Sequence, residues 1–167
     1  MTNCNLFITM QYMKVLMDAD CLIKLTKAKI KEIVCKNFSV VIPQAVKEEV
    51  IDNAVEHPDA TIIKKNIANK LLSIAQQRPS PHKGEDAVFT LFQQKKFDAI
   101  CSDDKRFIRR IKFFDVPYIT PAVFIVILLK QGALTLNEAY SKLVLLSPFV
   151  SDDEYNIVKS ALDNWRV

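Results

Sequence analysis

The sequence predicts an α/β protein in which a central, mainly parallel sheet lies between two layers of helices. Short apolar runs alternate along the chain with segments whose apolar residues recur at helical spacing. Strands that are apolar on both faces are typical of parallel sheets, because helices then cover both sides. Half of the 167 residues are hydrophobic and only two are glycine, so the chain has the material for a folded core. We therefore expect a three-layer α/β/α sandwich that ends in C-terminal helices.

Four short apolar runs are predicted to form the strands of this sheet. They are too short for helices, and they comprise residues 14–17, 39–42, 97–101 and 116–119. A fifth run, residues 71–75, fits either a strand or the end of a helix. Residues 77–84 contain two prolines and one glycine, and they form the clearest loop of the chain.

Apolar residues at helical spacing predict the helices. The first begins after a cap at Asp20, and others are predicted over residues 27–35, 43–53, 60–69 and 85–95 and from Asp104 to Lys112. Pro43 stands where a helix can begin, because its fixed φ suits a first helical position. The chain after residue 119 is predicted to form three helices, with breaks at Gly132 and near Ser147. These helices are expected to pack on the sheet as a cap.

The organisation that we expect is a single domain after a short extension. Regular structure begins at residue 14, so residues 1–13 are interpreted as an N-terminal extension and residues 14–167 as one domain. The N-terminus lacks the pattern of a signal peptide. The longest apolar run, residues 122–129, is shorter than the roughly 20 residues that a membrane helix needs. We expect a cytoplasmic protein that does not interact with membranes.

The four cysteines are predicted to be unpaired thiols. None stands at C-x-x-C spacing and only two histidines could join them, so a structural zinc site is not expected. Cys21, Cys35 and Cys101 have apolar neighbours, where a free cysteine behaves as a small hydrophobe. The net charge of +4 suits a phosphate-rich partner without requiring one.

Acidic residues fall where parallel-sheet proteins bind ligands, beyond the carboxyl ends of the strands. Asp18 ends the first predicted strand, and Asp103 and Asp104 follow the strand over residues 97–101. Glu85 opens a helix directly after the loop. Because parallel strands end at one edge of the sheet, we expect these carboxylates to approach one another.

Helix phase distinguishes Glu49 from its neighbour Glu48. At about 100° per residue, Glu49 lies beside the apolar positions Val46 and Val50, whereas Glu48 points away from them. Glu49 is therefore predicted to face inward and Glu48 to be solvated.

Clustered carboxylates repel one another, and a divalent cation relieves that repulsion. Mg²⁺ and Mn²⁺ prefer oxygen ligands and can activate water for attack on a phosphodiester. Each acid also has a structural interpretation. Asp20, Asp103 and Asp104 can cap helices, and Glu85 in a first helical turn is favoured by the helix dipole.

Four segments in this order resemble the motifs of the PIN-domain family. They are residues 15–20 (VLMDAD), residues 42–50 with Glu49, residues 84–88 (GEDAV) and residues 99–104 (AICSDD). Order and spacing agree over residues 14–119. The helical tail is similar to that of an uncharacterised bacterial and archaeal PIN subgroup related to VapC-type toxins.

The resemblance implies a metal-dependent ribonuclease. Its metal would be Mg²⁺ or Mn²⁺, and its acidic ligands would be Asp18, Glu49, Glu85 and Asp104. It further implies that the hydroxyl of Ser102 helps to hold the first aspartate, and that Asp103 substitutes for or assists Asp104. Asp20 replaces a small polar residue of the family, and it either supplements the metal site or only caps a helix. RNA is the implied substrate, and a cognate antitoxin or a second copy of the chain is a candidate partner.

Basic residues crowd the helix after the fourth motif. They are Lys105, Arg106, Arg109, Arg110 and Lys112. The three arginines share one face at i, i+3 and i+4 spacing. One interpretation is a solvated face, and the other is a track of RNA phosphates that leads into the acidic site.

Two alternatives of other classes stay open. The Asp18-x-Asp20 pair is similar to the first motif of haloacid-dehalogenase-type phosphohydrolases, although Leu22 stands where that family has threonine or valine. The second alternative is a catalytically inactive PIN-like binding module. In that case the apolar tail segments, residues 122–129 and 139–146, would contact a partner instead of packing in the core.

Overall fold

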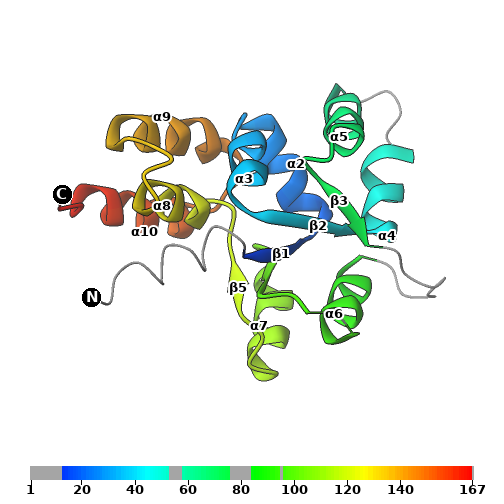
Figure 1. Ribbon diagram of the computed structural model, residues 1–167. Coiled ribbons are helices and arrows are strands. Elements are labelled where there is room, and N and C mark those ends of the chain that lie inside the picture. The colour runs from blue at the N-terminus through cyan, green and yellow to red at the C-terminus, as the bar shows by residue number, and fades with distance from the viewer. Residues whose placement is uncertain (1–12, 53–57, 76–83, 95, 167) are drawn as a thin grey trace, which may run out of the picture.

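The computed structural model contains an open sheet between layers of helices (Figure 1). The helices α2, α3 and α5 lie on one side of the sheet, and α6 and α7 lie on the other. The structure describes residues 13–52, 58–75, 84–94 and 96–166. Residues 1–12, with Cys4, and most of the predicted loop over residues 77–84 lie outside the described residues.

Within the described residues, five parallel strands form the sheet in the order β3-β2-β1-β4-β5. Their bounds are β1 Lys14–Met17, β2 Ser39–Pro43, β3 Ser73–Ala75, β4 Ala99–Cys101 and β5 Tyr118–Ile119. The chain moves outward from β1 through β2 to β3 and then returns to the other side of β1 for β4. This reversal places the topological switch point between β1 and β4, where such sheets bind ligands. The predicted three-layer, mainly parallel fold is confirmed. Residues 71–75, which the sequence assigned to either a strand or a helix end, contain the edge strand β3.

The helices and single helical turns occupy the segments between and after the strands. Their bounds are α2 Ala19–Lys27, α3 Lys31–Asn37, α4 Gln44–Lys47, the π-helical turn η1 Glu48–Asp52, α5 Pro58–Ala68, α6 Glu85–Gln94, α7 Lys105–Phe113, α8 Val123–Lys130, α9 Leu136–Leu146, the 3₁₀ turn η2 Ser147–Phe149 and α10 Asp152–Asp163. The predicted breaks at Gly132 and near Ser147 separate the last three helices.

The predicted helix over residues 27–35 is wrong in its boundaries, because a helix end falls inside it. Lys29 adopts a left-handed backbone with φ of 56°. Its N–H donates to the Thr26 carbonyl at 3.1 Å, and the Ile30 N–H donates to the Leu25 carbonyl at 3.0 Å. This pair of bonds is a Schellman motif, which usually has glycine at the left-handed position. Lysine at that position gave no sign of a helix end, so Lys27 belongs to α2 and the second predicted helix, α3, begins only at Lys31.

The predicted helix over residues 43–53 is also wrong in detail. Pro43 is the last residue of β2 and not a helical residue. The α-helical part ends at Lys47, and the chain continues through η1 with a wider turn. The π turn includes Glu49, whose side chain is exposed, while Val46 and Val50 on either side of it are buried as the predicted spacing requires.

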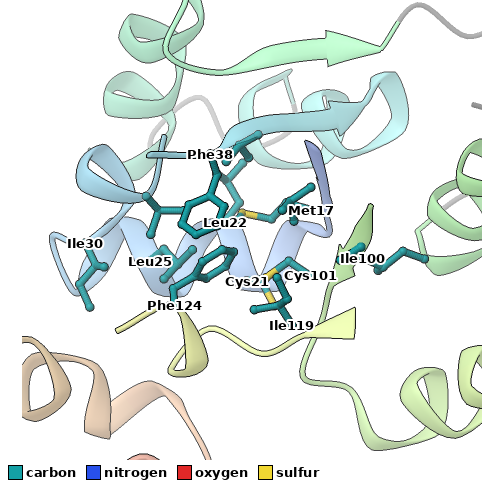
Figure 2. Packing of buried hydrophobic residues seen from close by; sticks show 14 of the residues in the cluster. Met17, Cys21, Leu22, Leu25, Ile30, Phe38, Ile100, Cys101, Ile119 and Phe124 are labelled. Carbon is teal, nitrogen blue, oxygen red and sulfur yellow. The ribbon is translucent and has the colours of Figure 1, made fainter. Parts of the chain in front are cut away.

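The C-terminal helices pack into the same core as the sheet. Phe124 of α8 is fully buried, and its ring meets that of Phe38 edge to face with centroids 5.0 Å apart (Figure 2). Both predicted tail segments contribute further buried side chains, among them Leu128 of α8 and Leu143 of α9. Core packing, the alternative to a partner surface, thus explains most of their apolar side chains, although Val144 and Leu145 of α9 are exposed.

The described cysteines are unpaired and buried, as expected for Cys21, Cys35 and Cys101. The sulfurs of Cys21 and Cys101 lie side by side beneath the ends of β1 and β4 (Figure 2). Among the described residues, every helix falls short of the length and apolarity that a membrane span requires.

Candidate active site

Asp18 stands at the junction of β1 and α2. Its side-chain oxygen accepts a hydrogen bond from the Cys21 N–H at 2.8 Å, so Asp18 is the N-cap of α2. Its own N–H donates to the Cys101 carbonyl at 3.2 Å, which ties the residue to β4. Asp18 is only 8% exposed. The predicted cap at Asp20 is therefore wrong, because the helix begins two residues earlier than expected.

Ser102 connects the ends of β1 and β4. It is fully buried, and its side chain hydrogen-bonds to the Asp18 carboxylate. The same hydroxyl oxygen accepts from the Asp104 N–H at 3.4 Å. Ser102 thus contacts both aspartates, and its bond to Asp18 is the one that the family resemblance implies.

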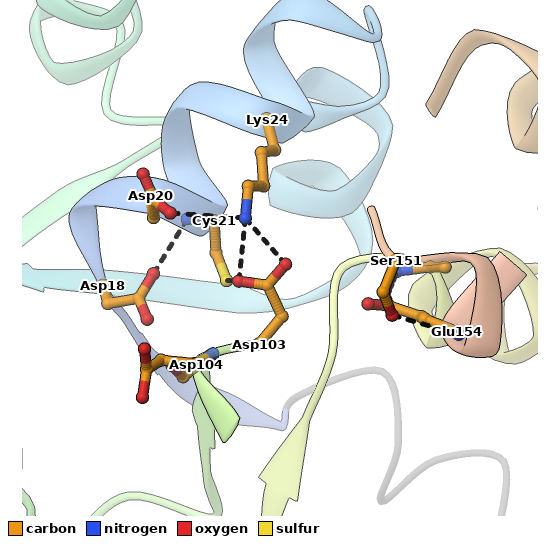
Figure 3. Close-up of polar contacts among 10 residues, drawn as sticks. Asp18, Asp20, Cys21, Lys24, Asp103, Asp104, Ser151 and Glu154 are labelled. Carbon is orange, nitrogen blue, oxygen red and sulfur yellow. Dashed lines mark hydrogen bonds and ion pairs between the residues drawn. The ribbon is translucent and has the colours of Figure 1, made fainter. Parts of the chain in front are cut away.

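Asp104 is the N-cap of α7. One carboxylate oxygen accepts from the N–H groups of Arg106 at 2.8 Å and Phe107 at 2.7 Å. These two bonds orient the carboxylate, which lies on the same side of the site as that of Asp18 (Figure 3). Asp104 is exposed, in contrast to Asp18.

One cavity brings the four candidate ligands together. Its volume is about 250 Å³, and its acidic lining includes Asp18, Glu49, Glu85 and Asp104. These residues come from the end of β1, η1, the start of α6 and the start of α7, so four separate segments converge at one edge of the sheet. Asp20 and Asp103 also line this cavity.

Glu49 reaches the cavity in a different way from the one predicted. The expectation that Glu49 faces inward and only Glu48 is solvated is wrong, because both side chains are exposed. Val46 and Val50 are buried as the helical phase predicts, but Glu49 lies at the edge of their buried face and not within it. Glu49 nevertheless lines the cavity, whereas Glu48 accepts a hydrogen bond from Gln44 at 3.3 Å.

Lys24 engages the two remaining acids. Its ammonium donates to both carboxylate oxygens of Asp103, at 2.9 and 2.7 Å (Figure 3). It also pairs with Asp20 at 3.3 Å, and the Asp20 side chain is 77% exposed. Sequence reasoning missed Lys24, although its i, i+4 spacing from Asp20 was a signal for that pair. The bond to Asp103 joins residues 79 positions apart and had no local signal.

The structure around Asp18 and Asp20 also bears on the phosphohydrolase alternative. That family needs a flap after its Asp-x-Asp motif, but α2 begins at Ala19 and leaves no segment for one. Asp20 lines the same cavity as Asp18, but its side chain is 77% exposed and pairs with Lys24.

A family model described as a PIN domain, DUF3368, matches residues 14–163. The chain belongs to the PIN-domain family. No curated protein matches the chain. PIN domains are in general nucleases that act on nucleic acids, and they typically use divalent metal ions.

The acids of this PIN domain occupy an electrostatically unfavourable site. Burial raises the pKa of Asp18, although hydrogen bonds from Ser102 and Cys21 oppose the shift. Burial also raises the pKa of Glu85, and the charges of Asp104 and Asp18 raise it further. Both shifts mean that the ionised carboxylates are destabilised where they stand. A bound cation would reverse this effect.

The donor set fits a magnesium-type ion. All of the candidate ligands are carboxylates, which such ions prefer, and the site opens to solvent. Among the described residues, no three acidic, histidine or cysteine side chains lie close enough to enclose an ion. Mg²⁺ does not need such a cage, because it commonly binds through one or two carboxylates and keeps several waters. Asp18 and Asp104 have the best-oriented carboxylates for this purpose.

Basic residues of α7 lie next to the acidic cavity of the PIN domain. Arg106 and Arg110 line a second cavity of about 390 Å³, which shares Glu85 and Asp104 with the acidic one. Arg110 pairs with Asp86 and lies over the Phe89 ring, 5.0 Å from its centroid.

The other predicted RNA-binding residues of α7 are exposed as well. Lys105 forms an exposed ion pair with Asp153 at 3.2 Å, and Arg109 donates to the Lys105 carbonyl. Arg106 and Arg110 thus line the cavity next to the acidic one, and the charge of Arg106 opposes the rise in the pKa of Glu85.

Proposed function

We propose that the protein is an Mg²⁺- or Mn²⁺-dependent endoribonuclease that hydrolyses RNA phosphodiester bonds. The observation that carries the proposal is the convergence of Asp18, Glu49, Glu85 and Asp104 on one cavity at the switch point of the sheet. Arg106 on the rim of the adjoining cavity supports a polyanionic substrate.

Each residue has a role that follows from its surroundings. Asp18 and Asp104 would hold the metal, and their carboxylates are oriented by Cys21, Ser102 and two N–H groups of α7. When bound, the ion supplies an activated water and stabilises charge on the phosphodiester. Glu49 and Glu85 would complete the acidic pocket or position that water. Asp103 is held by Lys24, so we assign it a supporting role at most.

A finer proposal concerns the biological role. We infer that the ribonuclease acts in the cytoplasm, which suits its unpaired thiols, as the toxin of a toxin–antitoxin pair. A small antitoxin protein and a second copy of the chain are its candidate partners. The presence of a small cognate gene beside this one, and rescue of growth on its co-expression, would test this role.

The central test is cleavage of an end-labelled RNA with Mg²⁺, Mn²⁺ or EDTA. We expect cleavage with either metal and none with EDTA. Direct attack by water leaves a 3′-hydroxyl and a 5′-phosphate, whereas a metal-free contaminating ribonuclease uses the 2′-hydroxyl and leaves a cyclic phosphate. RNA with 2′-fluoro substitution should therefore still be cut. Cleavage that survives EDTA, or no cleavage together with no Mn²⁺ binding in calorimetry, would contradict the proposal and favour an inactive module.

A pH-dependent stabilisation by metal is expected from the raised pKa values of Asp18 and Glu85. A carboxyl with a raised folded-state pKa binds its proton more tightly in the folded protein than in the unfolded chain. Its contribution to stability is therefore complete below its ordinary pKa and is lost as pH rises through the raised pKa. Added Mn²⁺ binds the ionised form, so it should stabilise the protein more at about pH 8 than at about pH 5.

Thermal unfolding with and without Mn²⁺ at these two pH values measures the effect. At a metal concentration of 100 times Kd, the expected stabilisation at the higher pH is about 2.7 kcal/mol. Asp18→Asn removes one of the two titrating groups and should reduce the pH dependence. An equal stabilisation at both pH values would mean that the ion binds elsewhere.

A further inference from the structure

Two large aromatic side chains are exposed at the end of α7. Phe113 is 83% exposed and Phe114 is 52% exposed. Their rings meet edge to face with centroids 5.3 Å apart, and Phe114 also leans on Phe89 at 5.2 Å. The ring of Phe113 is thus presented to solvent on a base of two other phenylalanines. Adjoining exposed rings of this kind are a candidate binding surface, because contiguous exposed apolar side chains often mark one.

Phe113 lies on the arginine face of α7. Arg106, Arg109, Arg110 and Phe113 stand at i, i+3, i+4 and i+7 positions and therefore form one stripe along the helix. The opposite stripe, with Phe107 and Ile111, is buried in the core. The exposed stripe therefore begins beside Asp104 at the acidic cavity and ends at an aromatic ring.

Two adjoining cavities connect the acidic site to the first part of the exposed stripe on α7. The acidic cavity and the second cavity share Glu85 and Asp104, and the second cavity is lined by Arg106 and Arg110. Arg110 in turn covers the Phe89 ring that supports Phe114. A ligand that reaches from the acids to Phe113 would meet carboxylates, then guanidinium groups and then exposed rings.

This succession matches the chemistry of an unpaired nucleic-acid strand. Arginines bind phosphates, and exposed aromatic rings stack on bases in a way that tolerates any sequence. A base in a duplex has both faces covered by its neighbours, so only a single strand offers a face to Phe113. The nine-residue rise from Asp104 to Phe113 is about 13 Å, which a strand spans within about four nucleotides, because stacked nucleotides rise about 3.4 Å each.

We propose that Phe113, supported by Phe114, is a stacking platform for one base of a single-stranded nucleic acid whose phosphates follow the arginine face of α7 into the acidic cavity. The proposal rests on the proposed nuclease function and specifies the form of its substrate. A second copy of the chain is a poorer occupant of this face, because a two-fold interface would bring the three arginines toward their own copies.

The test is binding of fluorescent oligonucleotides in EDTA, where the proposed reaction cannot proceed. We expect Phe113→Ala to weaken single-strand binding about 5- to 150-fold, and Phe113→Trp to bind at least as tightly as wild type. Single-stranded RNA and DNA are measured separately, and a loss with either supports the platform. Duplex binding should change little, because it uses only phosphate contacts. Ile157→Ala removes another exposed side chain, 68% exposed on α10, and should have no effect.

Three results would overturn the platform. They are wild-type affinity of Phe113→Ala for single strands, an equal loss on duplex, and a loss explained by a change from dimer to monomer in light scattering. A failure of the nuclease proposal would give different results in these assays. In that case no RNA is cut with either metal, although binding still depends on Phe113. Metal-dependent cleavage with no effect of Phe113 in the binding assay would reject the platform alone.

Discussion

Asp18→Asn is expected to reduce metal-dependent RNA cleavage by more than about 100-fold, because residues that only support a metal ligand already contribute about 10- to 100-fold. Asparagine keeps the size of the side chain and an oxygen that can accept from the Cys21 N–H, so the cap of α2 should persist. It removes the negative charge that binds the cation. Initial rates of cleavage at saturating Mn²⁺, with circular dichroism as a check on folding, measure the effect.

Asp152→Asn is the matched control for this variant. Asp152 is an exposed acid in the first turn of α10, outside the acidic cavity, and its replacement makes the same change in net charge. It should cleave RNA at the wild-type rate. The assignment of Asp18 is wrong if both variants retain full activity. A general effect of charge on RNA binding is indicated instead if both lose activity to the same extent.

The strands that form the centre of the sheet were predictable because burial on both faces leaves a continuous apolar run. β1 begins and ends at the predicted residues. β3 was ambiguous because it is a three-residue edge strand that pairs only with β2, and its residues are exposed or half-buried. An edge strand of this kind carries little of the burial signal that distinguishes strands from helix ends.

The sequence predicted that the acids would converge, but it was less accurate about how each acid is placed. The rule that ligands bind beyond strand ends brought Asp18 and Asp104 together without any structural information. Local sequence could not choose between Asp18 and Asp20 as the cap of α2. That choice is made by a bond across the sheet, from the Asp18 N–H to the Cys101 carbonyl. The helical phase correctly predicted that Val46 and Val50 are buried, but it did not predict that Glu49 beside them is exposed.

Other features of the site depend on contacts between residues far apart in the sequence, which local sequence patterns do not predict. Lys24 neutralises Asp103 across 79 positions of sequence. The basic residues of α7 were recognised by their spacing, but nothing in the sequence indicated that the helix would end in an exposed ring at Phe113. Apolar residues at a helix end are usually buried, and exposure becomes visible only when the neighbouring elements are in place.

Phe124→Ala is expected to destabilise the whole protein by about 3–5 kcal/mol, the usual cost of truncating a buried phenylalanine. Phe124 is fully buried and packs edge to face on Phe38, which precedes β2. The contact joins α8 to the layer that covers the sheet, so its loss should not be confined to the C-terminal helices. Because we propose that residues 14–167 form one domain, unfolding in urea should remain a single transition at a lower midpoint.

Phe113→Ala is the control, because it truncates the same side chain at a position that is 83% exposed. Its free energy of unfolding should change by no more than about 0.5 kcal/mol, as for most surface substitutions. Two separate transitions in Phe124→Ala, with loss of helical signal before loss of the sheet, would mean that the C-terminal helices form an independent unit. A single transition at a lower midpoint would instead mean that the acidic site and the C-terminal helices unfold together. The reason is that the residues that position Asp18 belong to the same hydrophobic core as these helices.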